Sequence, residues 1–201
     1  MSNRADRNLW DERRLVSSLK ERQEEAFRIL IRRYKTKLFS IAYGITSDRE
    51  QSFDIVQEVF LKVYENIHSF REDSSLSTWL HRITVNQCLN WKRRWKRRFR
   101  WHHQSIETDG GGYDPELRSD SHYTETAYEK KEFEKKLWEK IGELPEEARI
   151  VFVLRELEGL SYDEIAKTLK IKTGTVSSRL FYARKRLKEE LKEYLEEEQK
   201  L

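Results

Sequence analysis

One stretch of the chain is unsuited to any packed helix or strand, and it divides the rest of the sequence in two. The stretch SIETDGGGYDPELRSDS, from Ser105 to Ser121, contains three consecutive glycines, one of the two prolines and many acidic or small polar residues. No apolar period runs through it, and this composition is typical of a linker. The sequence therefore predicts two folded units, residues 1–101 and 126–201, joined by a flexible linker over residues 102–125.

Both flanking segments favour helices. The 201 residues include only 7 Gly and 2 Pro, and 38% of them are charged. Few helix breakers among abundant Glu, Lys, Arg and Leu predict an all-α protein. Apolar residues recur at helical spacing in a first stripe: Ala26, Phe27, Leu30, Ile31, Tyr34, Leu38, Ile41, Ala42 and Ile45. A second stripe, expected to face inward, comprises Phe53, Val56, Phe60, Val63 and Ile67. A third helix is expected to begin near Thr78, with Ser77 or Thr78 as its cap.

Several classes of protein are disfavoured by what the sequence contains. Cys88 is the only cysteine, so a buried small hydrophobic role is expected for it, and neither an internal disulfide nor a cysteine-based zinc site is. The N-terminus has no apolar signal core, and no stretch approaches the ~20 apolar residues of a membrane span. We expect a cytoplasmic protein. Metalloprotease, phosphate-loop and nucleophile motifs are not found, so no enzymatic activity and no cofactor are expected.

The C-terminal unit has the pattern of a helix-turn-helix. Ser161 and Glu164 form an S-x-x-E capping box that predicts a helix start. The break KIKTG follows, and Thr173 or Thr175 is expected to cap the next helix. A second helix rich in Arg and Lys after a tight turn is typical of DNA readers, in which it enters the major groove. A helical hairpin with a solvated basic face is the alternative. The outward residues are Ser177, Ser178, Phe181, Tyr182, Arg184, Lys185 and Lys188.

The segment before the linker is strongly basic. Seven of the fourteen residues from Asn90 to His103 are Lys or Arg, and no acid occurs from Trp79 to Ile106. On a helix, the amides and cations Asn86, Asn90, Arg93 and Arg97 share one face, away from Leu80, Thr84, Cys88, Trp91, Trp95 and Phe99. The aromatic stripe is explained in part by packing, and a solvated charged face is the simplest alternative. Because the cations repel one another, we expect a nucleic acid as partner, with outer Trp residues stacking on bases.

Together these segments resemble the extracytoplasmic-function sigma factors, the small two-domain members of the sigma-70 family. DIVQEVFLKVYENI, from Asp54 to Ile67, is similar to the most characteristic helix of that family. FREDSSLSTWLHRITVNQCLNWKRR, from Phe70 to Arg94, resembles its promoter-opening segment, and residues 144–187 resemble its C-terminal promoter reader. Three such motifs, in the right order and separated by a linker, make the resemblance specific.

The resemblance implies a sigma factor that directs promoter-specific initiation. Its implied partners are core RNA polymerase, through the clamp helices of the largest subunit and the flap of the second, promoter DNA, and an anti-sigma factor. The outward residues Asp54, Gln57, Glu58 and Leu61 would bind the clamp helices. The loop from Ser69 to Ser77 and the following helix would hold the melted minus-ten strand, with a flipped base in the loop. The linker would thread through polymerase.

Two sets of DNA-binding residues follow from the resemblance and the surface patterns. The set for the melted minus-ten element is Phe70, Ser74, Ser75, Thr78, Trp79, Arg82, Asn86, Asn90, Arg93, Arg94 and Arg97. The set for the duplex minus-thirty-five element is Thr173, Thr175, Ser177, Ser178, Arg179, Phe181, Tyr182, Arg184, Lys185 and Lys188. Dividing the reading between two tethered units raises the effective concentration of each.

The sequence departs from the family pattern at three positions. Phe53 stands where an acid commonly precedes the aspartate of the characteristic helix, and Ser177 and Tyr182 stand where cations are usual. Since the recognition helix lacks two cations, we expect DNA binding to depend more on residues 92–100, which a salt titration of each unit would test.

Two other classes of function fit parts of the sequence. A stand-alone operator-binding regulator would need neither the Asp54–Ile67 helix nor the linker. A nucleic-acid hydrolase has candidates only in His81, His102, His103 and scattered carboxylates, without a motif that joins them.

Overall fold

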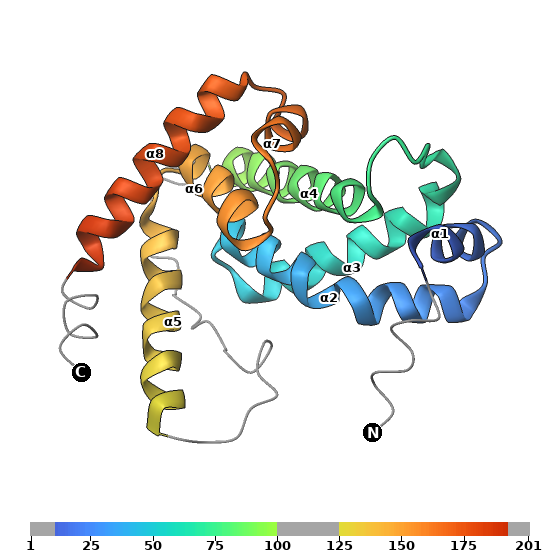
Figure 1. Cartoon of the computed structure of the whole chain (residues 1–201), viewed down its shortest axis with the longest axis horizontal. Coiled ribbons are helices and arrows are strands. Elements are labelled where there is room, and N and C mark those ends of the chain that lie inside the picture. The colour runs from blue at the N-terminus through green and yellow to red at the C-terminus, as the bar shows by residue number, and fades with distance from the viewer. Residues whose placement is uncertain (1–10, 100–124, 193–201) are drawn as a thin grey trace.

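The computed structural model describes residues 11–99 and 125–192, and the regular elements in these ranges are helices, as predicted (Figure 1). The N-terminal part contains α1 (Glu12–Lys20), α2 (Glu24–Thr46), α3 (Arg49–Asn66), the 3₁₀ turn η1 (Ile67–Ser69) and α4 (Leu76–Phe99). The C-terminal part contains α5 (Glu125–Glu143), α6 (Glu146–Phe152), the π-helical turn η3 (Val153–Leu157), α7 (Tyr162–Leu169) and α8 (Thr173–Glu190). The predicted linker lies outside the described residues except for Glu125, which begins α5.

Side-chain caps fix where α3 and α4 begin. Asp48 precedes α3, and its Oδ1 accepts a hydrogen bond from the Gln51 N–H at 2.9 Å. Ser47 takes the left-handed conformation, with φ of 57°, so the chain reverses between α2 and α3 within two residues. The expected start of the third helix is wrong by two residues: α4 begins at Leu76, and Ser75, not Ser77 or Thr78, caps it. Ser75 Oγ accepts from the Thr78 N–H at 3.1 Å because Ser75 is the last residue outside the helix.

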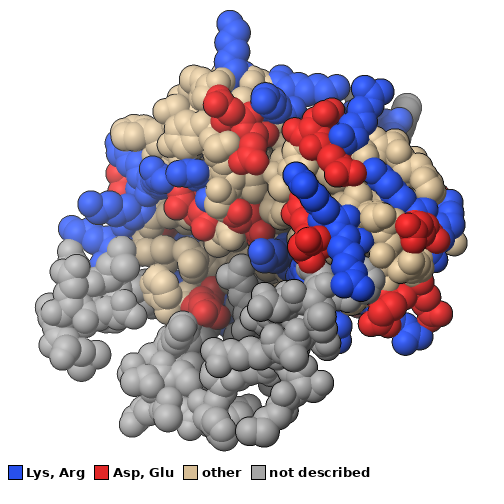
Figure 2. All heavy atoms as spheres, turned by 45° about the vertical axis from the view of Figure 1, so that its right-hand side comes forward, with Lys and Arg blue, Asp and Glu red and all other residues tan. Residues whose placement is uncertain are grey.

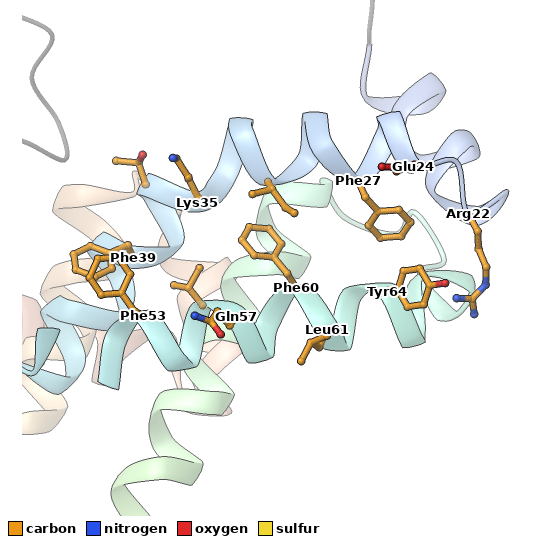
Figure 3. A pocket seen from close by; sticks show the side chains of 13 residues that line it. Arg22, Glu24, Phe27, Lys35, Phe39, Phe53, Gln57, Phe60, Leu61 and Tyr64 are labelled. Atoms are coloured by element: carbon orange, nitrogen blue, oxygen red, sulfur yellow. The ribbon is translucent and has the colours of Figure 1, made fainter. Parts of the chain in front are cut away.

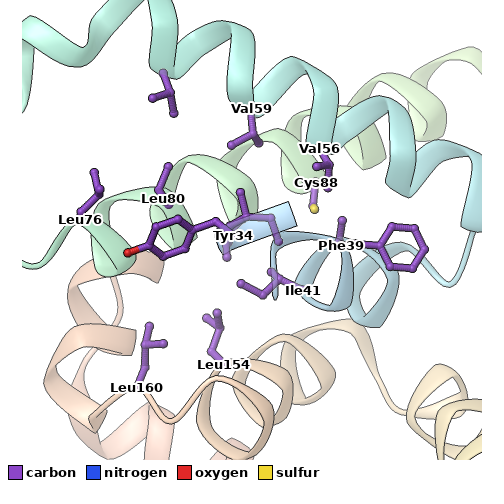
Figure 4. Packing of buried hydrophobic residues seen from close by; sticks show 14 of the residues in the cluster. Tyr34, Phe39, Ile41, Val56, Val59, Leu76, Leu80, Cys88, Leu154 and Leu160 are labelled. Atoms are coloured by element: carbon purple, nitrogen blue, oxygen red, sulfur yellow. The ribbon is translucent and has the colours of Figure 1, made fainter. Parts of the chain in front are cut away.

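The core lies where α2, α3 and α4 face one another (Figure 4). Leu38 and Ile41 of α2, Val59 of α3 and Leu80 of α4 are fully buried. Cys88 is buried among them, as predicted, and burial raises the pKa of its thiol to about 12. The apolar period of each helix therefore gives one continuous core along the bundle.

The C-terminal part contains the predicted helix-turn-helix. Ser161 and Glu164 form the capping box, with Ser161 Oγ accepting from the Glu164 N–H at 3.2 Å and Glu164 Oε2 accepting from the Ser161 N–H at 2.9 Å. The predicted cap of the next helix is wrong: Lys172 occupies the N-cap position of α8 without a side-chain bond, so Thr173 and Thr175 lie inside the helix. The apolar stripe of α8 is buried: Val176, Leu180, Ala183 and Leu187.

The two parts pack against each other, which the sequence did not reveal. Ile150, Val151 and Leu154 belong to the same buried cluster as residues of α2 and α4. Figure 4 shows Leu154 within this cluster. The approach is close at Gly44, where an added Cβ would lie 2.7 Å from Val153 Cγ2 and 3.2 Å from the Trp138 ring. A glycine in the last turn of the long helix α2 is explained here by close packing.

Polar contacts accompany this packing. Arg149 is 8% exposed and donates to Ser47 Oγ at 3.0 Å and to the Gly142 carbonyl at 2.7 Å. His81 of α4 and Glu158 are each 3% exposed at the side chain, and their Nε2 and Oε2 atoms lie 3.6 Å apart.

None of the helices in the described ranges combines the length and hydropathy that crossing a bilayer requires.

Candidate functional site

An apolar groove runs between α2 and α3 (Figure 3). Its volume is about 780 Å³, and aromatic rings line it from both helices. Ile31 is 42% exposed, Phe53 40% and Leu61 60%. A contiguous patch of exposed apolar side chains marks a protein interaction surface, because leaving such side chains in contact with water is unfavourable unless a partner covers them. The lining side chains are Arg22, Glu24, Phe27, Ile31, Lys35, Thr36, Phe39, Phe53, Val56, Gln57, Phe60, Leu61 and Tyr64.

Ring contacts hold this groove in shape. The ring centroids of Phe39 and Phe53 lie 4.6 Å apart, and those of Phe27 and Tyr64 lie 5.0 Å apart. The guanidinium of Arg22 lies 4.4 Å from the centroid of the Tyr64 ring. Such contacts between helices fix ring orientations without help from a partner. The groove is therefore formed in the free protein.

The predicted polymerase-binding residues divide between two surfaces. Gln57 and Leu61 line the apolar groove, whereas Glu58 lines a second groove between α3 and α4. Asp54 is exposed and lines neither. The expectation that Phe53 faces inward is wrong, because its ring packs on Phe39 at the groove surface and stays 40% exposed.

The second groove is polar and mainly basic. It measures about 660 Å³ and brings together Glu58, Lys62, Gln87, Asn90, Arg93, Arg94, Lys96 and Arg97. The predicted face of α4 is exposed, and Asn90 Oδ1 accepts from Arg93 Nη2 at 2.8 Å. Basic and acidic side chains are interspersed over the face of the molecule in Figure 2. The cations gathered in the second groove suit a polyanion whose phosphates contact several of them at once.

Two lysines of α4 contact the C-terminal part through one carboxylate. Glu146 Oε2 lies 3.0 Å from Lys96 Nζ and 3.5 Å from Lys92 Nζ. Burial, reinforced by the positive charge of Arg149, lowers the pKa of Lys92 to about 8. The same two ammonium groups lower the pKa of Glu146 against the opposing effect of its burial.

The lowered pKa of Lys92 predicts a pH-dependent stability. Between pH of about 8 and 10.5 the folded protein has lost the Lys92 proton, whereas the unfolded chain retains it, so stability rises with pH in this window. Lys92→Met is expected to raise stability at pH 7 and to remove this rise. Urea denaturation of both proteins at pH 7.5 and 9.5 measures the effect. An equal rise in the two proteins would contradict the assignment.

The loop before α4 and the first turn of α4 bring several predicted minus-ten residues together. Ser74, Ser75 and Arg82 are exposed, whereas Phe70 is 4% exposed and lies under Trp79, with ring centroids 5.1 Å apart. The structure thus places Phe70 behind the surface as support for the half-buried Trp79. Thr78 Oγ1 donates to Glu164 Oε1 of α7 at 2.9 Å.

The predicted duplex-reading residues lie along the outer side of α8. Phe181 is 70% exposed and Tyr182 44%, and the neighbouring polar residues are exposed or half-buried. Two cations on this helix pair with carboxylates of other elements. Arg184 Nη2 donates to Glu156 Oε1 at 2.6 Å, and Arg179 forms an ion pair with Glu147. These pairs reduce the positive charge that α8 presents.

The sequence reading missed the α2 side of the apolar groove. Phe27 and Ile31 were assigned to the core stripe, but in the structure Ile31 is exposed and Phe27 half-buried. The signal was present in the width of the stripe: residues 27, 31, 35 and 39 follow one another at four-residue spacing and form an edge beside the buried face. Nothing in the sequence indicated that Lys92 would be partly buried.

Comparisons with known proteins agree with this geometry. Residues 30–98 match the Sigma-70 region 2 family, and residues 134–187 match the Sigma-70 region 4 family. The ECF RNA polymerase sigma-E factor of Haemophilus influenzae is 36% identical over 179 residues, which cover 88% of this chain and 93% of that protein. The RNA polymerase sigma-H factor of Pseudomonas aeruginosa is 32% identical over 192 residues, covering 92% and 96%.

A solved structure shows the same fold across both parts. The sigma factor RpoE of Bartonella quintana, determined in complex with the anti-sigma factor NepR, is similar with a TM-score of 0.68 and 23% identity, covering 83% of this chain and 96% of that one. The described helices, the two matched regions and the identity over most of the chain lead to one family. The chain belongs to the ECF RNA polymerase sigma factors, and its function is promoter-specific initiation of transcription with RNA polymerase.

Proposed function

We propose that the apolar groove between α2 and α3 is the surface on which this sigma factor meets the clamp helices of the largest polymerase subunit. The exposed rings and Leu61 carry this proposal. A helical partner that places apolar side chains at three- and four-residue spacing would fill such a groove. Gln57 and Lys35 at the rim would then set its register. The flap of the second subunit remains the proposed partner of the C-terminal part.

Promoter reading is proposed to divide between α4 and α8. The exposed face of α4, with Asn86 and Asn90, would face the melted non-template strand of the minus-ten element, while the cations of the second groove hold its phosphates. Stacking and phosphate contacts, at about 1–3 kcal/mol per stacked base, offset the cost of unpairing the duplex. The outer side of α8 would read the duplex minus-thirty-five element, with the predicted linker leaving room between the two.

Strand capture at the start of α4 requires the C-terminal part to withdraw. Thr78 is bound to Glu164 of α7, and Lys92 and Lys96 are bound to Glu146 of α6. The carboxylates of Glu164 and Glu146 thus bind the Thr78 hydroxyl and two ammonium groups that could otherwise bind phosphates. We infer that the packed arrangement precedes engagement with polymerase. An anti-sigma factor is a proposed partner as well, since a helix seated in the apolar groove would exclude polymerase.

The experiment that tests this function is transcription from a pool of genomic fragments by bacterial core polymerase, with and without the protein. Start sites that appear only with the protein, and that share two upstream elements, are the expected result. Sigma factors are in general not enzymes, so polymerase supplies all the chemistry. Tight binding of duplex DNA by the protein alone, with no new start site, would instead favour an operator-binding regulator.

A further inference from the structure

The loop of residues 70–75 carries proposed strand-capturing residues, and its shape is held by a helix far away in the sequence. The loop connects η1 to α4, and α1 lies beside it. Two side chains of α1 reach the loop. Glu12 Oε1 accepts a hydrogen bond from the Leu76 N–H at 2.7 Å, and Lys20 Nζ lies 2.8 Å from Glu72 Oε1.

The first contact caps α4 from outside its own chain segment. Leu76 is the first residue of α4, so its N–H has no partner within the helix. Ser75, the local cap, satisfies the N–H of Thr78 instead. A carboxylate supplied from 64 positions earlier satisfies Leu76, and its negative charge also suits the positive end of the helix. The end of the loop is thereby tied to α1.

The second contact holds a conformation that the loop would not keep by itself. Glu72 has a φ of 62°, which lies in the left-handed region that residues other than glycine rarely adopt. Its carboxylate is anchored on Lys20 at the last turn of α1. α1 is itself rigidly placed, because Leu15 and Leu19 are fully buried. A fixed helix therefore holds both the middle and the end of the loop.

A cavity of about 590 Å³ lies between the two segments, and its walls come from both. Val16 of α1 and Phe70 of the loop are apolar, and the remaining lining residues are polar: Glu12, Arg13, Glu72 and Ser74. Moving the loop relative to α1 would change the shape of this cavity. A cavity of mixed character suits an unstacked base, which needs apolar contact on its faces and hydrogen bonds at its edge.

We propose that Glu12 is a positioning residue for capture of the melted strand: through the Leu76 N–H it fixes the loop against α1 and so sets the base preference of the site. This inference rests on the proposed role of the loop in strand capture. Glu12 acts through the backbone, so removing its carboxylate changes selection at the captured base without touching the apolar groove.

The test uses holoenzyme reconstituted from core polymerase with wild-type, Glu12→Ala, Glu12→Gln or Glu139→Ala protein. Binding of a fluorescent non-template oligonucleotide is measured with each base at the captured position, alongside affinity for core and the melting temperature. Glu12→Ala is expected to reduce the ratio of matched to mismatched affinity by about tenfold, the size of one hydrogen bond to a charged group. Glu12→Gln keeps an acceptor oxygen and is expected to restore most of the ratio. Glu139→Ala, in α5, removes an exposed ion pair with Lys136 and lines none of the described grooves, so it serves as the control.

The outcomes separate the possible failures. A ratio unchanged in Glu12→Ala would overturn the inference while leaving the proposed function in place. Equal weakening of matched and mismatched strands, together with a lower melting temperature, would also overturn it, since Glu12 would then be purely structural. Lys20→Met offers a second route to the same result, because it releases Glu72 without altering the cap. Wild-type holoenzyme that captures no strand would overturn the proposed function and this inference together.

Discussion

We expect Leu61→Asp to abolish holoenzyme formation, because it should lower the affinity for core polymerase by at least about a hundredfold. Leu61 is 60% exposed at the apolar groove, so the free protein loses little when it is replaced. In the complex, the new carboxylate would be buried against apolar side chains without a counter-charge, which costs several kcal/mol. Competition binding to fluorescently labelled core polymerase measures the effect directly.

Two further variants make this prediction specific to the groove. Leu61→Ala removes apolar contact without adding charge, and an intermediate loss of about tenfold is expected from the buried area forgone. Glu65 lies one turn further along α3, is exposed and does not line the groove. The affinity of Glu65→Ala protein for core polymerase should therefore equal that of wild type. Leu61→Asp protein that assembles normally would place the polymerase contact elsewhere on the molecule.

Gly44→Val is expected to separate the C-terminal part from the N-terminal bundle. The first added carbon alone would lie 2.7 Å from Val153 Cγ2, and Val153 is fully buried and stiff, so it cannot move aside. Overpacking of this kind costs about 1–3 kcal/mol. Since valine is tolerated within a helix, α2 itself should persist. Amide hydrogen exchange should then quicken around Val153 and Trp138 but not in the contacts of α3 with α4.

A matched glycine shows whether the effect comes from packing. Gly174 lies in α8 with nothing within 4 Å of an added Cβ. Gly174→Ala should therefore stabilise the protein slightly, by up to about 1 kcal/mol, through helix propensity alone. Unchanged exchange around Trp138 in Gly44→Val protein would mean that the two parts are not held together at this point.

The helices and their apolar faces could be predicted because they are written in local patterns. The stripe of α8 and the Ser161–Glu164 capping box depend on residues three or four positions apart. The misplaced caps show the limit of such reading. Ser75, Ser77 and Thr78 are all good N-cap residues, and only the path of the loop decides that Ser75 is the last residue outside α4.

The functional surfaces were only half predictable for the same reason. The exposed face of α4 follows from its own period, so the exposure of Asn86, Asn90 and Arg93 was predicted correctly. The apolar groove requires two helices, and its α2 side looked like ordinary core until the packing left Ile31 and Phe27 uncovered. Phe53 was misjudged because periodicity places a residue on a face but does not say whether a neighbour covers it.

By itself, the sequence determined an all-α chain in two parts, the positions of its main helices, the helix-turn-helix and the family to which it belongs. Local hydrogen bonding and apolar periodicity suffice for the helices and the helix-turn-helix, whereas the family follows from the resemblance of three sequence motifs. Only the tertiary structure decided that Gly44 meets Val153, that Glu12 caps α4, and that Lys92 lies half-buried beside Arg149. These contacts join residues dozens of positions apart, and burial, charge and shape at such points depend on how whole helices pack.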